Sequence, residues 1–148
     1  MMLVEEMLEK ARERLVTLAD GARLVEAAAL LRQADTHIIV LHGSDGMLTG
    51  VMTRWDVLGQ VVQCHGAVGE NTAATAMTRN VTVCQPRDQL DEVWSKMKAG
   101  DYKGVPVTDA SNRPLGVLMA RDVLQVLLEA SENEEAVLRD YVMGVGYR

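Results

Sequence analysis

Two kinds of hydrophobic pattern alternate along this chain. Short runs of aliphatic and β-branched residues, typical of strands, precede stretches in which apolar residues recur every three or four positions, as on one face of a helix. The run Leu15–Leu18 leads through a turn into the helical positions Leu24, Ala27, Ala28 and Leu31. The run Val81–Cys84 leads in the same way into Leu90, Val93, Trp94 and Met97.

Each of these helical patterns is followed by two more strand-like runs joined by a tight polar turn. The turns lie at Ser44–Gly46 and at Ala110–Asn112, and a second helical pattern begins near Arg54 and near Ala120. Each unit therefore predicts the order β-α-β-β-α. A unit of roughly 60 residues is too small to bury its faces well alone, so we expect the two units to pack as one body.

The two units are copies of each other. The octapeptide GVMTRWDV, which begins at Gly50, returns as GVLMARDV, which begins at Gly116, with Met119 in the place of Thr53. When Gly50 is aligned with Gly116, the same offset gives eight identical pairs without a gap, which indicates a tandem duplication. The pairs are Leu24 and Leu90, Glu26 and Glu92, Asp35 and Asp101, Gly50 and Gly116, Val51 and Val117, Asp56 and Asp122, Val57 and Val123, and Leu58 and Leu124.

Two further helices are predicted outside the repeats. An apolar stripe precedes the first repeat, and the segment after the second repeat opens with Ser131 and Glu134 as a capping box. We expect each of these helices to cover the repeat next to it. The predicted organisation is an N-terminal helix at residues 1–14, a first repeat at 15–66, a linker at 67–80, a second repeat at 81–130, and a C-terminal helix and tail at 131–148.

Composition and charge narrow the possible functions. The 148 residues are 48% hydrophobic and 24% charged, as in a globular protein. The net charge of −6 and the lack of a basic run argue against a nucleic-acid partner, although a few local cations suffice for one small anionic ligand. The sequence has no apolar run long enough for a membrane span and no secretory signal, and its two cysteines are too few for a disulfide framework. We expect a cytoplasmic protein that does not contact membranes.

The order and repetition of these motifs resemble a pair of cystathionine beta-synthase (CBS) domains, the arrangement called a Bateman module. The resemblance runs roughly from Leu15 to Ala130, and it includes AMTRNVTVCQP at residues 76–86 and YKGVPVTD at residues 102–109. The first repeat lacks the family's proline, and the second has Met119 where the family usually has Ser or Thr. The resemblance implies an α/β (α+β) fold in which two β-α-β-β-α repeats pack with pseudo-two-fold symmetry.

The resemblance also implies a function. Such modules bind an adenine nucleotide between their repeats, pair into homodimers and regulate a separate partner protein. AMP, ADP, ATP, NAD and S-adenosylmethionine stay open as ligands. A scaffold or dimerisation module with empty sites is the alternative, and an enzyme is a more distant one.

Thr53 and Asp56 admit two interpretations. A Thr at a strand-to-helix junction with an acidic residue three positions later predicts a capping box that needs no ligand. The same helix N-terminus can bind a phosphate, and the carboxylate can accept hydrogen bonds from a ribose. In the family, the Asp binds ribose and the Ser or Thr binds phosphate. The resemblance therefore favours a nucleotide here.

The resemblance implies further site residues in both repeats. Lys103, at the family's basic position, Arg54 and Arg121 are candidate phosphate ligands, and the opening strands would hold adenine. We expect the two sites to differ in affinity or ligand, because Met119 offers no useful hydrogen bond and its site would rely on Lys103, Arg121 and backbone N–H groups for any phosphate. The expected ligand-binding residues are Thr17, Leu18, His37, Ile39, Thr53, Arg54, Asp56, Thr82, Val83, Cys84, Lys103, Gly104, Val105, Pro106, Met119, Arg121 and Asp122.

Catalysis finds little support in the sequence. It contains no phosphate loop, no nucleophile elbow and no HExxH motif. The histidines and cysteines are His37, His42, His65, Cys64 and Cys84, and only Cys64 and His65 are adjacent. We expect no catalytic residue, no metal and no catalytic cofactor.

Overall fold

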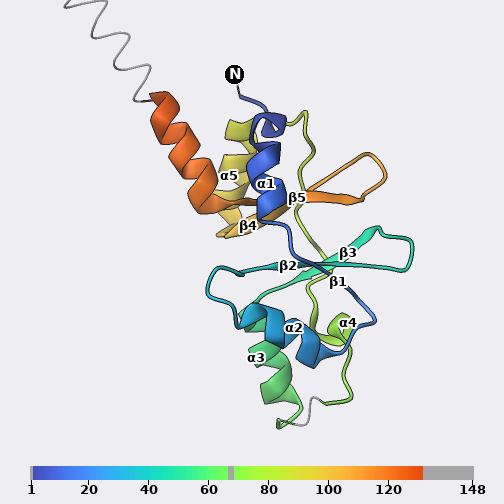
Figure 1. The fold of residues 1–148 in the computed structure, drawn as a ribbon. Coiled ribbons are helices and arrows are strands. Elements are labelled where there is room, and N and C mark those ends of the chain that lie inside the picture. The colour runs from blue at the N-terminus through green and yellow to red at the C-terminus, as the bar shows by residue number, and fades with distance from the viewer. Residues whose placement is uncertain (1, 67–68, 132–148) are drawn as a thin grey trace, which may run out of the picture.

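The computed structural model describes residues 2–66 and 69–131, and its first repeat is a three-stranded sheet with two helices (Figure 1). Strand β1 pairs in parallel with β2, and β2 pairs antiparallel with β3, in the order β1-β2-β3. The β2-β3 hairpin turns at Gly46, whose φ of 81° suits glycine. The elements are β1 (Thr17–Ala19), α2 (Leu24–Leu31), β2 (Ile39–His42), β3 (Leu48–Met52) and α3 (Arg54–Gln63).

The second repeat keeps the helices and the hairpin of this plan. Strands β4 and β5 form an antiparallel pair, and a helix that covers residues 120–131 follows β5 directly. The two repeats are joined at their hairpins, where the Leu48 N–H donates to the Asn112 carbonyl at 2.9 Å. The predicted mixed α/β class is confirmed. The elements with printed bounds are α5 (Leu90–Gly100), β4 (Gly104–Thr108) and β5 (Pro114–Met119).

The strand predicted at Val81–Cys84 does not form, and only an isolated parallel bridge joins Cys84 to Val107. In the first repeat, the Val40 N–H donates to the Val16 carbonyl at 2.9 Å and continues the β1-β2 ladder. Pro106 is the repeat counterpart of Val40 and has no N–H to donate. The proline therefore removes the corresponding hydrogen bond and limits the second sheet to two strands.

The N-terminal helix covers the second repeat, and the expectation that it covers the first is wrong. Helix α1 (Leu8–Glu13) and the short 3-10 helix η1 (Val4–Met7) lie beside β5 and α5 in Figure 1. The linker helix α4 (Ala73–Ala76) packs on the first repeat. Ala11 and Met77 are equivalent positions under the repeat, so the helix before each repeat is exchanged onto the other repeat.

This exchange explains why both octapeptides begin with glycine. A Cβ at Gly116 would lie 2.7 Å from the Cβ of Ala11 on α1. A Cβ at Gly50 would lie 2.7 Å from the carbonyl oxygen of Thr78, just beyond α4. Both distances are shorter than a carbon can tolerate, so each glycine admits the segment that crosses over from the other repeat.

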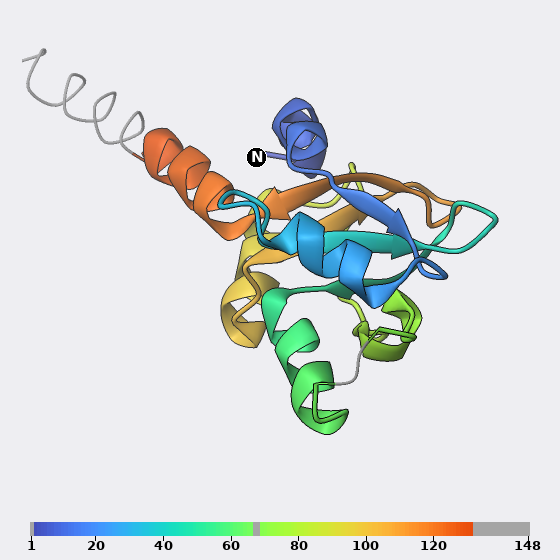
Figure 2. The same ribbon diagram turned by 60° about the horizontal axis from the view of Figure 1, so that its bottom comes forward.

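Three hydrophobic clusters hold the molecule together. One joins α1 to the second repeat, one joins α4 to the first, and the third lies between the repeats. Figure 2 shows the strands of both repeats in the middle of the molecule with helices outside them. The buried members of the third cluster are Ile38, Val40, Val51, Val117 and Met119.

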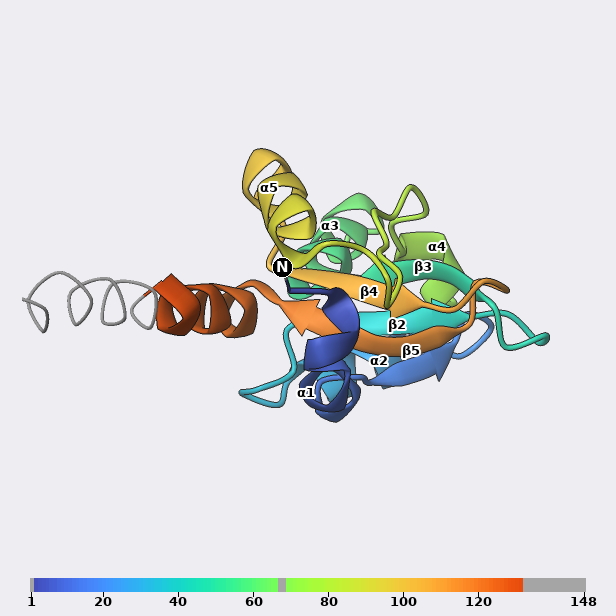
Figure 3. The same cartoon turned by 90° about the horizontal axis from the view of Figure 1, so that it is seen from above.

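The helix at residues 120–131 points away from the sheets in Figure 3. Ser131, one half of the predicted capping box, is helical and is the last described residue of this helix. Glu134, the other half of the predicted capping box, and the rest of segment 132–148 lie outside the described residues. Within the described part of the chain, no helix has the length and apolar character required to span a membrane.

Candidate functional site

A cleft with a volume of about 430 Å³ opens where the two repeats meet. The first repeat contributes the N-terminus of α3 and the residues before β2, and the second contributes the residues before β4. Side chains of the third hydrophobic cluster lie at its inner wall. The lining residues are His37, Ile38, Val51, Thr53, Arg54, Trp55, Asp56, Thr78, Asn80, Val81, Thr82, Asp101, Tyr102, Lys103 and Gly104.

Asp56 holds the N-terminus of α3 as the capping-box interpretation predicts. Its Oδ2 accepts a hydrogen bond from the Thr53 N–H at 2.8 Å and lies 3.3 Å from the Thr53 hydroxyl. Its Oδ1 accepts the Thr78 hydroxyl at 3.0 Å. Each carboxylate oxygen can accept more than one hydrogen bond, so this half-buried group caps the helix and keeps acceptor capacity towards the cleft.

Arg54 and Lys103, two cationic residues that line the cleft, differ in the contacts they make. Arg54 donates from Nε to the Leu31 carbonyl at 2.8 Å and from Nη2 to the Gln33 carbonyl at 2.9 Å, so it secures the end of α2. Lys103 is exposed and forms no ion pair within residues 2–66 and 69–131. Of the two, Lys103 is the more available to an anionic ligand.

His37 lies beside Arg54, with its Nδ1 3.4 Å from Nη1 of the guanidinium. Burial of the ring lowers the pKa of His37, and the positive charges of Arg54, Arg121 and Lys103 lower it further. The imidazole is therefore neutral at pH 7. It offers the cleft one donor or acceptor and no fixed charge.

Two aromatic side chains at the rim are absent from the sequence prediction. Trp55 is 78% exposed although it borders the cleft, and Tyr102 is 41% exposed, with its hydroxyl 3.3 Å from that of Thr82. Large exposed aromatic residues next to a pocket are typical of binding sites. The sequence signal for both is their position next to an expected site residue. Trp55 follows Arg54, and Tyr102 precedes Lys103.

The structure brings together part of the set of seventeen expected ligand-binding residues. Those that line the cleft are His37, Thr53, Arg54, Asp56, Thr82, Lys103 and Gly104. Buried positions hold Ile39, Cys84, Val105, Pro106, Met119 and Asp122. The remaining members are Thr17 and Leu18 on β1, Val83 before α5, and the exposed Arg121. Apart from the rim, the lining residues that the prediction missed are Ile38, Val51, Thr78, Asn80, Val81 and Asp101.

The corresponding place in the second repeat is built differently. Asp122 is 9% exposed and forms an ion pair with Arg14, whose Nε donates to Oδ2 at 2.9 Å and whose Nη2 donates to Oδ1 at 3.1 Å. The hydrogen bond to Asp122 raises the pKa of Arg14 above its ordinary value. Met119 is 6% exposed and packs in the cluster between the repeats.

The cysteines and histidines form no reactive centre in the described residues. No group of three or more His, Cys, Asp or Glu side chains there is placed to hold a metal ion. Burial raises the pKa of the Cys84 thiol to about 12, so it stays protonated. Cys64 accepts hydrogen bonds from the side-chain amides of Gln60 and Asn71 at 3.2 and 3.4 Å.

Comparison with known sequences finds relatives much longer than this chain. A homoserine O-acetyltransferase of Methanosphaera stadtmanae is 32% identical over 122 residues, and an L-aspartate semialdehyde sulfurtransferase of Methanocaldococcus jannaschii is 28% identical over 121. The matches cover 77% and 82% of this chain. The chain spans only about a quarter of these relatives, at 24% and 22% of their lengths.

Comparison with solved structures finds the same architecture. A CBS-domain protein of Agrobacterium tumefaciens superimposes with a TM-score of 0.73 at 28% identity, covering 84% of this chain and 98% of that one. A CBS domain pair solved with 5′-methylthioadenosine and S-adenosyl-L-methionine gives a TM-score of 0.71 at 26% identity, covering 87% and 98%. The family model named CBS domain matches residues 4–63 and 73–129. The chain therefore belongs to the CBS domain family.

Proposed function

We propose that this chain is a regulatory module that binds one adenosyl ligand in the cleft between its repeats and reports the occupancy of the cleft to a separate partner protein. CBS domain pairs are regulatory modules, and relatives bind adenosyl ligands. The observation that carries the proposal is the Asp56 carboxylate, which stands at the N-terminus of α3 and borders a cleft of about 430 Å³. A cleft of this size admits a nucleoside.

The lining residues supply the groups that an adenosyl ligand needs. Asp56 would accept hydrogen bonds from the ribose hydroxyls, and the aliphatic side chains of Ile38, Val51 and Val81 would pack against the adenine. Lys103 and the N-terminus of α3 would hold a single phosphate where the ligand carries one. The solved CBS domain pair with 5′-methylthioadenosine and S-adenosyl-L-methionine supports an adenosyl group as the common feature. AMP, ADP, ATP and NAD share that group.

A catalytic role receives no support from the residues at the cleft. The enzymes among the relatives are about four times as long as the matched segment, so their reactions do not transfer to this chain. The hydroxyl groups of Thr53 and Thr78 meet the Asp56 carboxylate, which already caps α3, and the Cys64 and Cys84 thiols do not line the cleft. We propose that the chain is not an enzyme.

We also propose that the module is a homodimer. Leu58 and Val62 on α3 are 52% and 75% exposed, and their counterparts Leu124 and Leu128 on the helix at 120–131 are 41% and 53% exposed. The exposed pairs on the two helices are related by the repeat. A second copy of the chain would cover both pairs in a single interface with two-fold symmetry. Light scattering should give twice the 16.2 kDa of the chain, and a monomer at micromolar concentration would contradict this.

The ligand proposal is tested by thermal melting with a panel of AMP, ADP, ATP, NAD, S-adenosylmethionine and 5′-methylthioadenosine. A ligand that binds only the folded state stabilises it by RT ln(1 + [L]/Kd), about 2.7 kcal/mol at one hundred times Kd. At least one adenosyl compound should raise the melting temperature, while guanosine monophosphate, as the matched control, should not. If the whole panel leaves melting unchanged, the scaffold alternative is favoured.

A further inference from the structure

The two repeats treat their equivalent aspartates in opposite ways. Asp56 accepts hydrogen bonds from neutral donors, the Thr53 N–H and the Thr78 hydroxyl, and borders an open cleft. Asp122 is clamped by both arms of one guanidinium, with N···O distances of 2.9 and 3.1 Å. Both carboxylates have a donor on each oxygen, but Asp122 is 9% exposed and has a charged partner, whereas the partners of Asp56 are neutral and the residue lines the cleft. Only Asp56 retains the freedom to meet an external diol.

The residue that clamps Asp122 has a defined counterpart in the first repeat. Arg14 follows α1, and the offset that aligns the two repeats places it opposite Asn80, which follows α4 and lines the open cleft. The amide of Asn80 is short and neutral, so it borders the cleft without filling it. The long guanidinium of Arg14 reaches the carboxylate itself. The exchanged N-terminal helix thus delivers an arginine to the second site.

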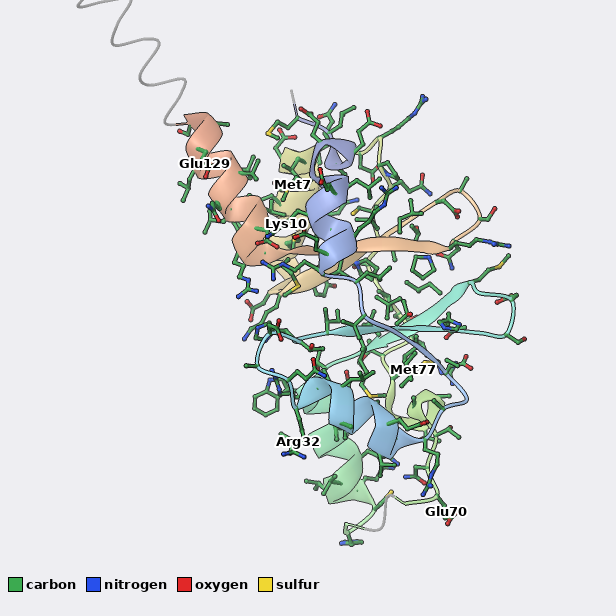
Figure 4. The ribbon with its side chains drawn as sticks, in the orientation of Figure 1. Met7, Lys10, Arg32, Glu70, Met77 and Glu129 are labelled. Carbon is green, nitrogen blue, oxygen red and sulfur yellow. The ribbon has the colours of Figure 1, made fainter. Side chains whose placement is uncertain are left out.

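Two more features distinguish the second place from the first cleft. Met119 replaces the hydroxyl of Thr53 and fills buried space, since its sulfur would lie 3.1 Å from a Cβ at Gly104. The groove on the outer side of Asp122 is lined by Glu6, Glu9, Glu13 and Glu129, and among the described residues Lys10 is the one basic side chain that lines it. Figure 4 labels three residues that border this groove: Met7 at the end of η1, Lys10 on α1 and Glu129 on the helix at 120–131. Of its lining residues only Asp122 has its repeat counterpart, Asp56, in the first cleft, so this groove is a separate surface on the far side of the carboxylate.

We propose that Arg14 is the resident occupant of the second site, so that the chain binds a single adenosyl ligand, at Thr53 and Asp56, and that the identity of the residue at positions 14 and 80 decides which site is open. This inference rests on the proposed function, because it assumes that the first cleft binds an adenosyl ligand. It goes further by assigning the stoichiometry and the residue that sets it. Arg14, at the end of the N-terminal helix, thus competes with an external ligand for the Asp122 carboxylate.

Two variants exchange the character of the sites. Arg14→Asn combined with Met119→Thr gives the second site the first site's residues at these two positions, and should raise the stoichiometry from one ligand per chain to two. Asn80→Arg places a guanidinium beside Asp56 at an exposed position, and should weaken binding at the first site at least tenfold. Asn80→Gln, which is longer but neutral, is the matched control and should lose much less affinity than Asn80→Arg.

The measurement is isothermal titration calorimetry with 5′-methylthioadenosine and, separately, AMP. One ligand per wild-type chain and two per double variant support the inference. Two per wild-type chain, or one for both proteins, overturns it and leaves the proposed function standing. If neither compound nor any other adenosyl compound of the melting panel binds the wild type, the proposed function fails and this inference fails with it. If circular dichroism shows that the double variant is unfolded, Asn80→Arg decides, and wild-type affinity there overturns the inference.

Discussion

Helix α3 and the helix at 120–131 carry the same Asp-Val pair in their first turns, but the two aspartates make different contacts. At α3, Asp56 caps the helix and faces a cleft between the repeats. At the second helix, Asp122 is used inside the protein to fix the exchanged N-terminal segment through Arg14. A duplicated motif can therefore persist for two reasons. Asp122 forms an ion pair inside the protein, and Asp56 has acceptor capacity left for a ligand.

The largest effect that tests this comparison is on ligand affinity. Asp56→Ala should weaken adenosyl binding about 10- to 100-fold, since a hydrogen bond to a charged group contributes about 1.5–3 kcal/mol. Asp122→Ala should leave affinity unchanged, although it strands a partly buried guanidinium and lowers stability by about 2 kcal/mol. Calorimetry gives the affinities, and urea unfolding gives the stabilities.

Asp56→Asn is the control that separates charge from capping. The amide oxygen can still accept the Thr53 N–H, so the helix start is retained, while the negative charge is lost. Its affinity should fall between those of Asp56→Ala and the wild type. Equal losses of affinity in Asp56→Ala and Asp122→Ala would erase the distinction between the two helix starts.

The duplicated plan of the fold was predictable from the sequence, because it depends on local patterns. Hydrophobic periodicity located α2, α3, α5 and both hairpins, and the repeat predicted two units that share a core. The pattern at Thr53 and Asp56 predicted a capping interaction that the structure contains. The motifs assigned Lys103 and Thr82 to the second repeat's site, whereas the structure places both at the cleft beside Thr53 and Asp56.

The features that were missed depend on contacts between distant residues. An apolar stripe at residues 3–15 predicts a buried helix face but not which repeat buries it. The Arg14–Asp122 pair joins residues that are 108 positions apart, so no local pattern signals it. The absence of a strand at Val81–Cys84 could have been predicted, because Pro106 is the repeat counterpart of Val40. The consequence of its missing N–H emerges only when the β1-β2 register is known.

The next effect concerns the glycines that admit the exchanged segments. Gly116→Ala should destabilise the protein by about 1–3 kcal/mol, because its Cβ would meet the backbone and Cβ of Ala11. Gly50→Ala should cost a similar amount and should also weaken ligand binding, since it pushes on Thr78, which donates to Asp56. Gly21→Ala has nothing within 4 Å of the new Cβ and is the control. Urea unfolding that ranks Gly21→Ala with the other two would contradict the exchange.

A smaller effect concerns the strand that the second repeat lacks. Pro106→Val restores an N–H at the position equivalent to Val40, and that N–H should donate to the Thr82 carbonyl and extend the sheet. The gain of about 1 kcal/mol for a hydrogen bond is offset in part by the greater freedom of the unfolded chain. Hydrogen exchange should show a protected amide at position 106. Rapid exchange there would mean that something other than the proline prevents the strand.

The smallest expected effect is the pH dependence of His37, which borders the cleft. Burial and the charges of Arg54, Arg121 and Lys103 lower its pKa from 6.5, and Asp35 opposes them. Between the folded pKa and 6.5 the unfolded chain holds more protons, so stability rises with pH in that window and is lost as pH falls through it. The wild type should therefore lose stability relative to His37→Gln as the pH drops below 6.5, and the difference should level off once both states are protonated. Because a bound phosphate would raise the pKa of His37, AMP should suppress this loss and uncharged 5′-methylthioadenosine should not. Urea unfolding of both proteins from about pH 5 to about pH 8 measures the difference, and parallel curves would show that His37 does not sense the charge in the cleft.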